Sequence, residues 1–352
     1  MISLARRGKT TCPQCGHKTF VNYLYENGTA VADGQCGKCD RADKCGAHIP
    51  PREYFKGRSF AADLTIKGDN GAVYNEPDYI DRTLMERTLG HYDLNPLARW
   101  LHGIFDPKIG EDKVTDILIE RHVGTSRRWG GATVFWQVDR SGKVRTGKVM
   151  GYNPLTGKRI HERNNWVHSL LTSSAAANPT SSSTSQASRP GNYNLRKCYY
   201  GSDISAENRP IWLFESEKAA LIVDMVLTWG GGGLKMAAPM ATCGCGNLNP
   251  TLAAKNDPYD KIQVLKDRTV VLFPDEGTFD EWMEKGRKLK RFCKEVWIST
   301  VMERTLHPHV VQCEINPGDG FDDLLLRYID SGLDLWTLLL TSYGYRLTYR
   351  LG

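Results

Sequence analysis

Two short apolar runs in the second half of the chain each end abruptly in a carboxylate. Residues 211–214 run directly into Glu215, and residues 270–273 run through one proline into Asp275. A stretch with helical spacing follows each run, and strands alternating with helices predict a parallel sheet with right-handed crossovers. Ligands of such sheets bind at the carboxyl ends of the strands. We therefore expect Glu215 and Asp275 to share a site suited to Mg²⁺ and phosphate.

The same rhythm continues through the rest of the second half. Further strands are expected at residues 295–300 and 310–315. Helices are expected at residues 218–227, 278–292 and 321–329. Together these elements predict an α/β domain of several parallel strands.

Changes in composition divide the chain into four parts: residues 1–51, 52–171, 172–192 and 193–340. The first part is rich in Cys and Gly. The second mixes helical spacing at residues 79–101 with a predicted hairpin at residues 131–152, so it is expected to be an α+β domain. Ser, Thr, Ala and Asn dominate the third part, which is typical of a flexible linker or surface insertion. The fourth part carries the parallel sheet.

Positive charge is concentrated in the first half of the chain. The formal net charge is only +6, but residues 120–163 hold ten Lys and Arg against three Asp and Glu. A basic first half joined to an acidic site in the second half suits a protein that binds a polyanion with one part and processes it with another. The alternative is that the basic residues form a solvated surface. The candidate nucleic-acid contacts are Arg121, Arg127, Arg128, Lys143, Arg145 and Lys148.

The sequence offers no sign of a membrane segment. It contains no run of eighteen apolar residues, and its first residues lack the apolar core of a signal peptide. We therefore expect a cytoplasmic protein with no membrane partner.

Five of the ten cysteines lie between residues 12 and 45. In a reducing compartment such clustering favours a metal site over disulfides, with a redox thiol site as the competing interpretation. Cys12 and Cys15 form one half of a zinc knuckle. Generic ribbon spacing pairs them with Cys36 and Cys39, but Cys45 follows closely, so Cys39 with Cys45 is also possible. A structural Zn²⁺ is expected in either case.

The strand ends at Glu215 and Asp275 resemble those of a toprim domain, the catalytic fold of DnaG-type primases, topoisomerases and some nucleases. Residues 318–325 resemble the acidic segment that follows a later strand in primase-type toprims. The chain as a whole is similar to zinc-ribbon-plus-toprim proteins of Bacteroidetes genomes and their mobile elements. The segments that carry this likeness are residues 37–48, 134–148, 215–218 and 273–275.

The resemblance implies a particular set of ligands and catalytic groups. It implies that Cys12, Cys15, Cys39 and Cys45 bind zinc, with Cys36 as the alternative fourth ligand. It makes Asp275 the Mg²⁺ or Mn²⁺ ligand and Glu215 a second ligand or the general acid/base. Gly277 stands where a second toprim aspartate is expected, so Glu276 or Asp280 would take over the role of that aspartate. Asp319 and Lys218 complete the list of catalytic candidates. The alternative is a purely structural role, in which these acids cap the helices that follow them.

Zinc ribbon, basic domain and toprim follow one another in the order of a DnaG-type primase core. This resemblance implies a Mg²⁺-dependent nucleotidyltransferase that acts on nucleotides and a single-stranded DNA template. The alternative is a non-catalytic DNA-binding accessory protein of replication or mobilisation, and a toprim nuclease is a third possibility. No helicase motor is visible in the sequence, so unwinding would need a separate replicative helicase.

Overall fold

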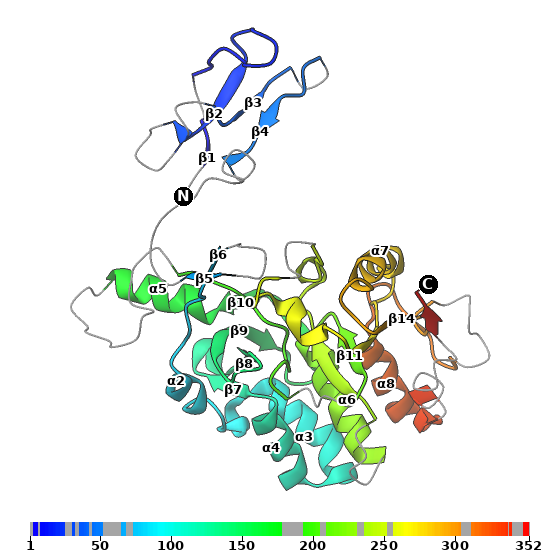
Figure 1. Cartoon of the computed structure of the whole chain (residues 1–352). Coiled ribbons are helices and arrows are strands. Elements are labelled where there is room, and N and C mark those ends of the chain that lie inside the picture. The colour runs from blue at the N-terminus through cyan, green and yellow to red at the C-terminus, as the bar shows by residue number, and fades with distance from the viewer. Residues whose placement is uncertain are drawn as a thin grey trace. The chain divides into compact units, whose positions relative to one another are not determined.

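The computed structural model divides into two compact units, residues 1–64 and residues 65–352 (Figure 1). The structure describes residues 3–5, 8–24, 30–31, 35–41, 44–51, 65–67, 73–177, 193–204, 209–230, 236–251, 256–303, 311–336, 338–339 and 348–351. The predicted boundary after residue 51 adjoins residues 52–64, which lie outside this described part. None of the helices described is long and apolar enough to cross a bilayer.

The first unit is a small antiparallel sheet. Its strands β1 (Ser3–Leu4), β2 (Phe20–Leu24), β3 (Gly37–Cys39) and β4 (His48–Ile49) pair in sequence order. Phe20 is fully buried, and a Cβ added at Gly37 would lie 2.5 Å from its ring. Gly37 therefore lets β3 pass close to the aromatic ring that fills this small core.

The second unit begins with a two-stranded sheet, β5 (Thr65–Lys67) and β6 (Val73–Asn75). An antiparallel sheet follows, with strand order β10-β9-β8-β7. Its strands are β7 (Val123–Ser126), β8 (Ala132–Val138), β9 (Val144–Tyr152) and β10 (Arg159–Trp166). The helices of this region are α2 (Arg82–Glu86), α3 (Pro96–Ile109), α4 (Glu111–Glu120) and α5 (Val167–Ala177).

Asn95 joins α3 to this antiparallel sheet. Its side-chain oxygen accepts hydrogen bonds from the Ala98 backbone N–H, at 3.2 Å, and from the Thr133 hydroxyl, at 2.7 Å. Its amide nitrogen donates to the carbonyl oxygen of Gly124, at 3.2 Å. One fully buried side chain thus caps the helix and ties it to β7 and β8.

The second sheet contains the predicted parallel strands in the order β12-β11-β13-β14-β15. The strands are β11 (Ile211–Phe214), β12 (Ala238–Ala241), β13 (Thr269–Leu272), β14 (Glu295–Ser299) and β15 (Thr348–Arg350). All neighbouring pairs are parallel except β14 with β15. The chain is therefore an α/β protein with an N-terminal zinc-ribbon-like sheet and a C-terminal parallel sheet, as the sequence predicts.

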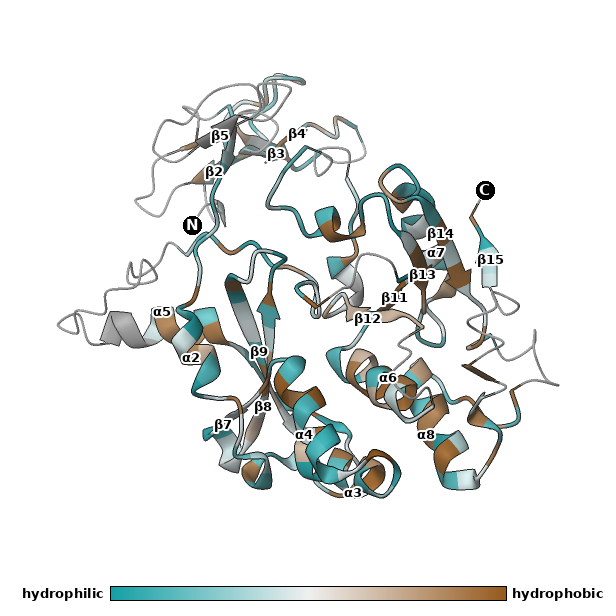
Figure 2. Cartoon of the chain, turned by 60° about the horizontal axis from the view of Figure 1, so that its bottom comes forward, coloured by the Kyte–Doolittle hydropathy of each residue, from teal (hydrophilic) through white to brown (hydrophobic). Residues whose placement is uncertain are grey.

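Both faces of the parallel sheet are covered by helices (Figure 1). Alternate residues of β11 and β13 pack against α6 (Glu217–Gly230) and α8 (Phe321–Ser331) on one face, and the intervening residues pack against α7 (Phe279–Leu289) on the other. Apolar residues accordingly run along the strands and along α6 and α8 (Figure 2). Two-sided burial explains why these strands are continuously apolar in sequence rather than alternating.

The antiparallel and parallel sheets share one hydrophobic core. Phe105 of α3, Phe135 of β8 and Phe214 of β11 belong to the same buried cluster, and α6 packs against α3 and α4 as well as against α8. The two parts that composition separates at residues 171 and 193 are therefore packed as one unit in the structure.

Three expectations about local structure need adjustment. Residues 79–101 are not one helix, because the left-handed residues Gly90 and His91 separate α2 from α3. Residues 311–315 form no strand, and residue 310 lies outside the described part. Helix α5 continues to Ala177, which makes the first six residues of the predicted linker helical; residues 178–192 are outside the described part.

Candidate functional site

Four thiols of the first unit gather into one cluster. The sulfurs of Cys12, Cys15, Cys39 and Cys45 all lie within 4.8 Å of one another. Cys12 Sγ lies 3.7 Å from Cys45 Sγ, and Cys15 Sγ lies 3.9 Å from Cys39 Sγ. Sulfurs bound at about 2.3 Å to one tetrahedral Zn²⁺ stand about 3.8 Å apart. The geometry therefore fits a structural zinc site with Cys45 as the fourth ligand.

Local turns bring these thiols together. The backbone N–H of Gly16 donates to the Cys12 carbonyl oxygen at 2.9 Å, and Gly16 adopts a φ of +71°. Gly46, which follows Cys45, has a φ of +63°. Glycine adopts this left-handed conformation without strain, which allows each ligand pair its tight turn. Cys36 is buried outside the cluster.

The second unit contains a cavity of about 420 Å³ at the carboxyl ends of β11 and β13. Glu215 follows β11 directly, and Ser216 caps α6 by accepting a hydrogen bond from the Ala219 N–H at 3.0 Å. Asp275 follows β13 in a tight turn, in which its carbonyl oxygen accepts from the Thr278 N–H at 3.0 Å. Glu215, Asp275 and Glu276 all line the cavity, so the two predicted strand ends do converge.

The first turn of α8 contributes two further carboxylates. Asp322 and Asp323 line the same cavity, and Lys218 of α6 reaches both. Lys218 Nζ lies 3.1 Å from Asp322 Oδ2 and 3.6 Å from Asp323 Oδ1. Asp323 also accepts a hydrogen bond from the Gly320 N–H at 3.0 Å, which fixes the start of α8. Lys218, at the start of α6, is therefore paired with the two acids of α8 and orients them.

Crowding of these acids changes their protonation. Burial, together with the charges of Asp322, Glu215 and Asp323, raises the pKa of Asp275 to about 8, although Lys218 opposes the shift. Burial also raises the pKa of Asp322. The pKa of Lys218 is lowered by burial and raised by Asp322 and Asp323, and the net effect is an increase. The cavity therefore holds more negative charge than its own cations neutralise.

Oxygens of two of these carboxylates approach the backbone at one glycine. At Gly320 an added Cβ would stand 2.6 Å from Asp322 Oδ1 and 3.0 Å from Asp275 Oδ1, so both oxygens converge where glycine leaves space. Among the described residues, the four cysteines are the one group of three or more Cys, His, Asp or Glu whose ligand atoms all lie within 4.8 Å of one another, so the carboxylates of the cavity are spaced more widely. Loose carboxylate sites suit Mg²⁺, which keeps several of its waters.

Two predicted catalytic acids lie outside this cavity. Asp280 is exposed in the first turn of α7 and does not line it. Asp319 pairs instead with Arg327, whose Nη1 lies 2.6 Å from Asp319 Oδ2. The Asp319 carbonyl oxygen accepts from the Glu276 N–H at 2.8 Å, so this residue ties the two acidic loops together.

The predicted basic contacts divide into exposed and internal residues. Arg127, Arg128 and Lys143 are exposed. In contrast, Arg121, Arg145 and Lys148 are buried and hold partners inside the unit: Asp224 at 2.7 Å, Asp139 at 2.6 Å and Glu217 at 3.2 Å, respectively. These three cations are therefore paired within the unit, and removing one of them would leave a buried carboxylate uncompensated.

Several residues of the cavity escape sequence reasoning. Asp322, Asp323, Glu217, Tyr152 and Arg159 all line it but were not among the candidates for the site. Asp322 and Asp323 stand in the segment that carries the toprim resemblance, and the pair of acids just after a glycine was the signal available. Nothing in the sequence indicates that Tyr152 and Arg159, from β9 and β10, reach the ends of β11 and β13.

Comparison with known families identifies the chain. A family model described as a domain of unknown function, DUF6371, matches residues 95–276, which is more than half of the chain. The chain belongs to the DUF6371 family. A second model, described as a zinc beta-ribbon finger, matches residues 3–60 and covers the four clustered cysteines. The DUF6371 match includes Glu215 and Asp275 and stops before the acids of α8. No curated protein matches the chain.

Solved structures similar to this DUF6371 protein include several primases. The primase fragment of the bacteriophage T7 primase–helicase protein is 13% identical, with 94% of this chain and 97% of that chain covered and a TM-score of 0.38. The Aquifex aeolicus primase (zinc-binding and RNA polymerase domains) is 11% identical, with 99% and 81% covered and a TM-score of 0.35. The DnaG primase catalytic domain bound to ssDNA is 13% identical, with 75% of each chain covered and a TM-score of 0.31. These overlaps are loose, so the functional conclusion is drawn from the residues of the site.

Substitution of single cysteines separates the two possible fourth ligands of the zinc. Cys45→Ser removes a thiol of the cluster, and we expect the purified chain to lose most of its zinc. Cys36→Ser leaves all four clustered thiols in place, and about one zinc ion per chain should remain. Metal analysis of both proteins after gel filtration gives the answer. Full zinc content in the Cys45→Ser protein would contradict the assignment.

The raised pKa of Asp275 predicts a pH-dependent stability. The folded protein holds the Asp275 proton up to a pH of about 8, whereas an unfolded aspartate releases it near pH 4. In magnesium-free buffer this residue therefore lowers the free energy of unfolding progressively as the pH rises between these values. Asp275→Asn should become more stable than the parent across that interval and differ little below pH 4. Thermal melts at several pH values test this, and parallel stability curves would contradict it.

Proposed function

We propose that this chain is a primase-like nucleotidyltransferase, which uses Mg²⁺ or Mn²⁺ to join nucleotides on a single-stranded DNA template. One observation carries the proposal. Glu215, Asp275, Asp322 and Asp323 converge on one cavity at the ends of two adjacent parallel strands, where burial and like charge raise the pKa of Asp275 to about 8. A divalent cation that binds among acids held so close relieves their mutual repulsion, and this relief favours metal binding.

In this proposal the chain's own residues divide the work. Asp275 and Asp322 present the oxygens that would hold the cation, and a bound Mg²⁺ would neutralise the nucleotide phosphates. Glu215 lines the same cavity and takes the proton of the attacking 3′-hydroxyl. Lys218 keeps Asp322 and Asp323 in place, and Arg159 faces the cavity as a cation for phosphate oxygens.

The acids of α8 support the toprim part of the proposal. Gly277 stands where the resemblance expects a second aspartate, and it lies exposed in the turn after Asp275 with a φ of +81°. Oxygens of Asp322 and Asp275 lie 2.6 Å and 3.0 Å from the place that a Cβ at Gly320 would take, and Asp322 is 3% exposed. We infer that Asp322, rather than Glu276 or Asp280, serves as the second metal-binding aspartate that the resemblance expects at position 277.

A basic edge strand offers a path for the template. Among the described strands, β10 pairs with β9 alone, and its exposed residues include Arg159 and Arg163. Arg159 also lines the acidic cavity, so this strand leads from the surface to the proposed catalytic groups. Single-stranded nucleic acid follows such positive tracks through its phosphates. We place the template on β10, with Arg127, Arg128 and Lys143 as further exposed cations.

The absence of an acid at Gly277 also favours a second candidate, a DNA-binding accessory protein with a reduced metal site. That protein would bind single strands through the same β10 cations and make no primer. A separate replicative helicase would be a partner in either case.

Primer synthesis distinguishes the two candidates. Full-length protein is incubated with single-stranded DNA, labelled nucleotides and Mg²⁺ or Mn²⁺, and products are resolved on a gel. We expect primers from the parent. Glu215→Gln, Asp275→Asn and Asp322→Asn should each lower the rate by about 10²–10³-fold, as happens when one charge-stabilising group is removed from an active site.

Asp330→Asn is the matched control, because Asp330 is exposed at the far end of α8; it should keep the parental rate. Tight DNA binding without any primer would select the accessory protein. Cleavage of the DNA that depends on the same acids would select a nuclease.

The salt dependence of DNA binding tests the β10 path. Each phosphate contact with a single strand contributes about −0.7 to the slope of log affinity against log salt concentration. Arg159→Ala and Arg163→Ala should each reduce the steepness by about this amount. Arg287→Ala, an exposed arginine on α7, serves as the control and should leave the slope unchanged. Equal slopes for all variants would remove β10 from the interface.

A further inference from the structure

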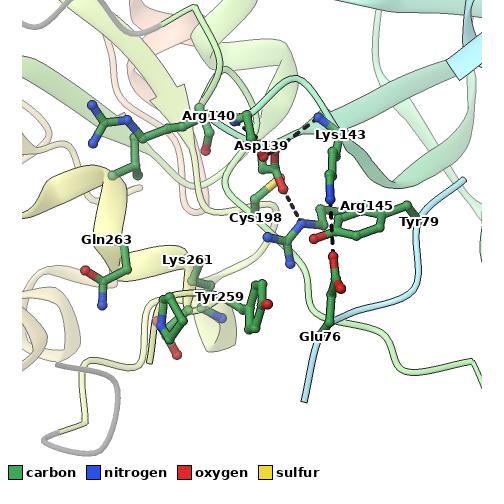
Figure 3. A pocket seen from close by; sticks show the side chains of 15 residues that line it. Glu76, Tyr79, Asp139, Arg140, Lys143, Arg145, Cys198, Tyr259, Lys261 and Gln263 are labelled. Atoms are coloured by element: carbon green, nitrogen blue, oxygen red, sulfur yellow. Dashed lines mark hydrogen bonds and ion pairs between the residues drawn. The ribbon is translucent and has the colours of Figure 1, made fainter. Parts of the chain in front are cut away.

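A second cavity of the same unit, about 530 Å³ in volume, shares no lining residue with the acidic one. Its walls are the turn between β8 and β9, residues 76 and 79, residues 198 and 202, and the segment 258–264 (Figure 3). A volume of this size lies within the range of small-molecule sites, about 300–1,000 Å³. Of its lining residues, the catalytic proposal uses Lys143 alone, as one exposed cation near the template.

Arg145 and two tyrosines form one wall of this cavity. The pairing of β8 with β9 shifts between Gln137 and Val138, which leaves Arg145 as the extra residue of a bulge. Its guanidinium carbon lies 5.2 Å from the centre of the Tyr79 ring and 5.9 Å from that of Tyr259. Bulges re-aim side chains in this way next to functional sites. The result is a cation held between two aromatic rings that both border the cavity (Figure 3).

This wall is fixed before any ligand binds. Arg145 Nε donates to Asp139 Oδ2 at 2.6 Å, and Arg145 Nη1 donates to the Arg196 carbonyl oxygen at 3.2 Å. Lys143 Nζ lies 4.3 Å from the centre of the Tyr79 ring and 3.2 Å from Glu76 Oε1. Side chains locked by ion pairs lose little entropy when a ligand arrives, which favours binding.

The two cavities differ in the sign of their charge. The acidic cavity is lined by six carboxylates and three cations, whereas this one is lined by four cations, Arg140, Lys143, Arg145 and Lys261, and three carboxylates, Glu76, Asp139 and Asp260. An anion therefore meets net attraction here without a metal ion. In the acidic cavity the same anion needs a cation first.

Lys261 is the cation best placed to receive an anion. It begins the short helix η7 (Lys261–Leu265) and is half-buried. Burial lowers the pKa of Lys261, although Asp260 opposes the shift. No hydrogen bond or ion pair joins its ammonium to another residue of the described part, in contrast to Lys143. A poorly hydrated ammonium gains more from an anion than one in open solvent.

We propose that this cavity is a second, metal-independent binding site for a nucleotide, with the base stacked on Tyr259 or Tyr79 and the phosphate held by Lys261 and Lys143. Planar rings beside fixed cations match a ligand that is itself a planar base carrying an anion. Gln263 and Asp260 border the same space and add polar groups for the edge of the base. The site does not depend on catalysis at the acidic cavity.

Calorimetric titration of the full, zinc-loaded chain with ATP in magnesium-free buffer tests the proposal. Tyr259→Leu removes the ring but keeps an apolar side chain, and Lys261→Gln removes the charge; each should weaken binding at least about tenfold. Lys266→Gln, exposed just beyond η7, is the matched control and should bind as the parent does. Asp275→Asn should also keep parental affinity. Melting curves verify that each variant is folded.

Parallel titrations distinguish a free nucleotide from a nucleotide within a DNA strand as the ligand of this cavity. A short oligonucleotide replaces ATP in a parallel titration, and weakening of either ligand by both site variants supports the site. Adenosine and pyrophosphate alone should each bind more weakly than ATP. The proposal would be overturned if ATP did not bind in the absence of metal. It would also be overturned if Asp275→Asn abolished ATP binding while Tyr259→Leu and Lys261→Gln left it intact. Loss of primer synthesis alone would not, because that outcome concerns the acidic cavity.

Discussion

Helix α6 holds three charged side chains, and each is paired with a different part of the second unit. Glu217 meets Lys148 of β9, Lys218 meets Asp322 of α8, and Asp224 meets Arg121, which caps the end of α4. The rest of the helix is apolar and nearly all of it is buried. Removing one partner from such a buried pair costs about 3–5 kcal/mol, because the other charge is left uncompensated. These pairs fix the rotation of α6 and, with it, the direction in which Glu215 leaves β11.

This dependence explains which parts of the structure could be read from the sequence. Glu215 and Asp275 lie at strand ends as the sequence predicts, because a strand buried on both faces is a continuous apolar run whose end is clear in the sequence. Arg121, a predicted nucleic-acid contact, is instead buried against Asp224, which lies 103 residues away along the chain. Lys148 and Glu217 are likewise 69 residues apart. Sequence spacing reports local pairs, whereas long-range ion pairs depend on how the two sheets pack.

The choice between Asp319 and Asp322 shows the same limit on a smaller scale. Both follow the glycine-rich approach to α8, and either could have faced Asp275. Gly320 opens the helix between them, so Asp322 turns toward the cavity while Asp319 turns to Arg327. The residue at which α8 begins decides this outcome, and sequence reasoning locates a helix start only to within a few residues.

In the first unit, the metal takes the place of a hydrophobic core. Its buried cluster consists of Cys12, Phe20, Cys39 and Ala47, so two of its four members are also thiols of the metal site. Among the described residues of this unit, the apolar side chains of this cluster are too few to offset the conformational entropy of ordering the strands around them. Zinc binding therefore adds to the folding free energy of the ribbon and couples ligation to folding. Gly37 contributes to the same small core, because its lack of a side chain lets β3 approach the Phe20 ring closely.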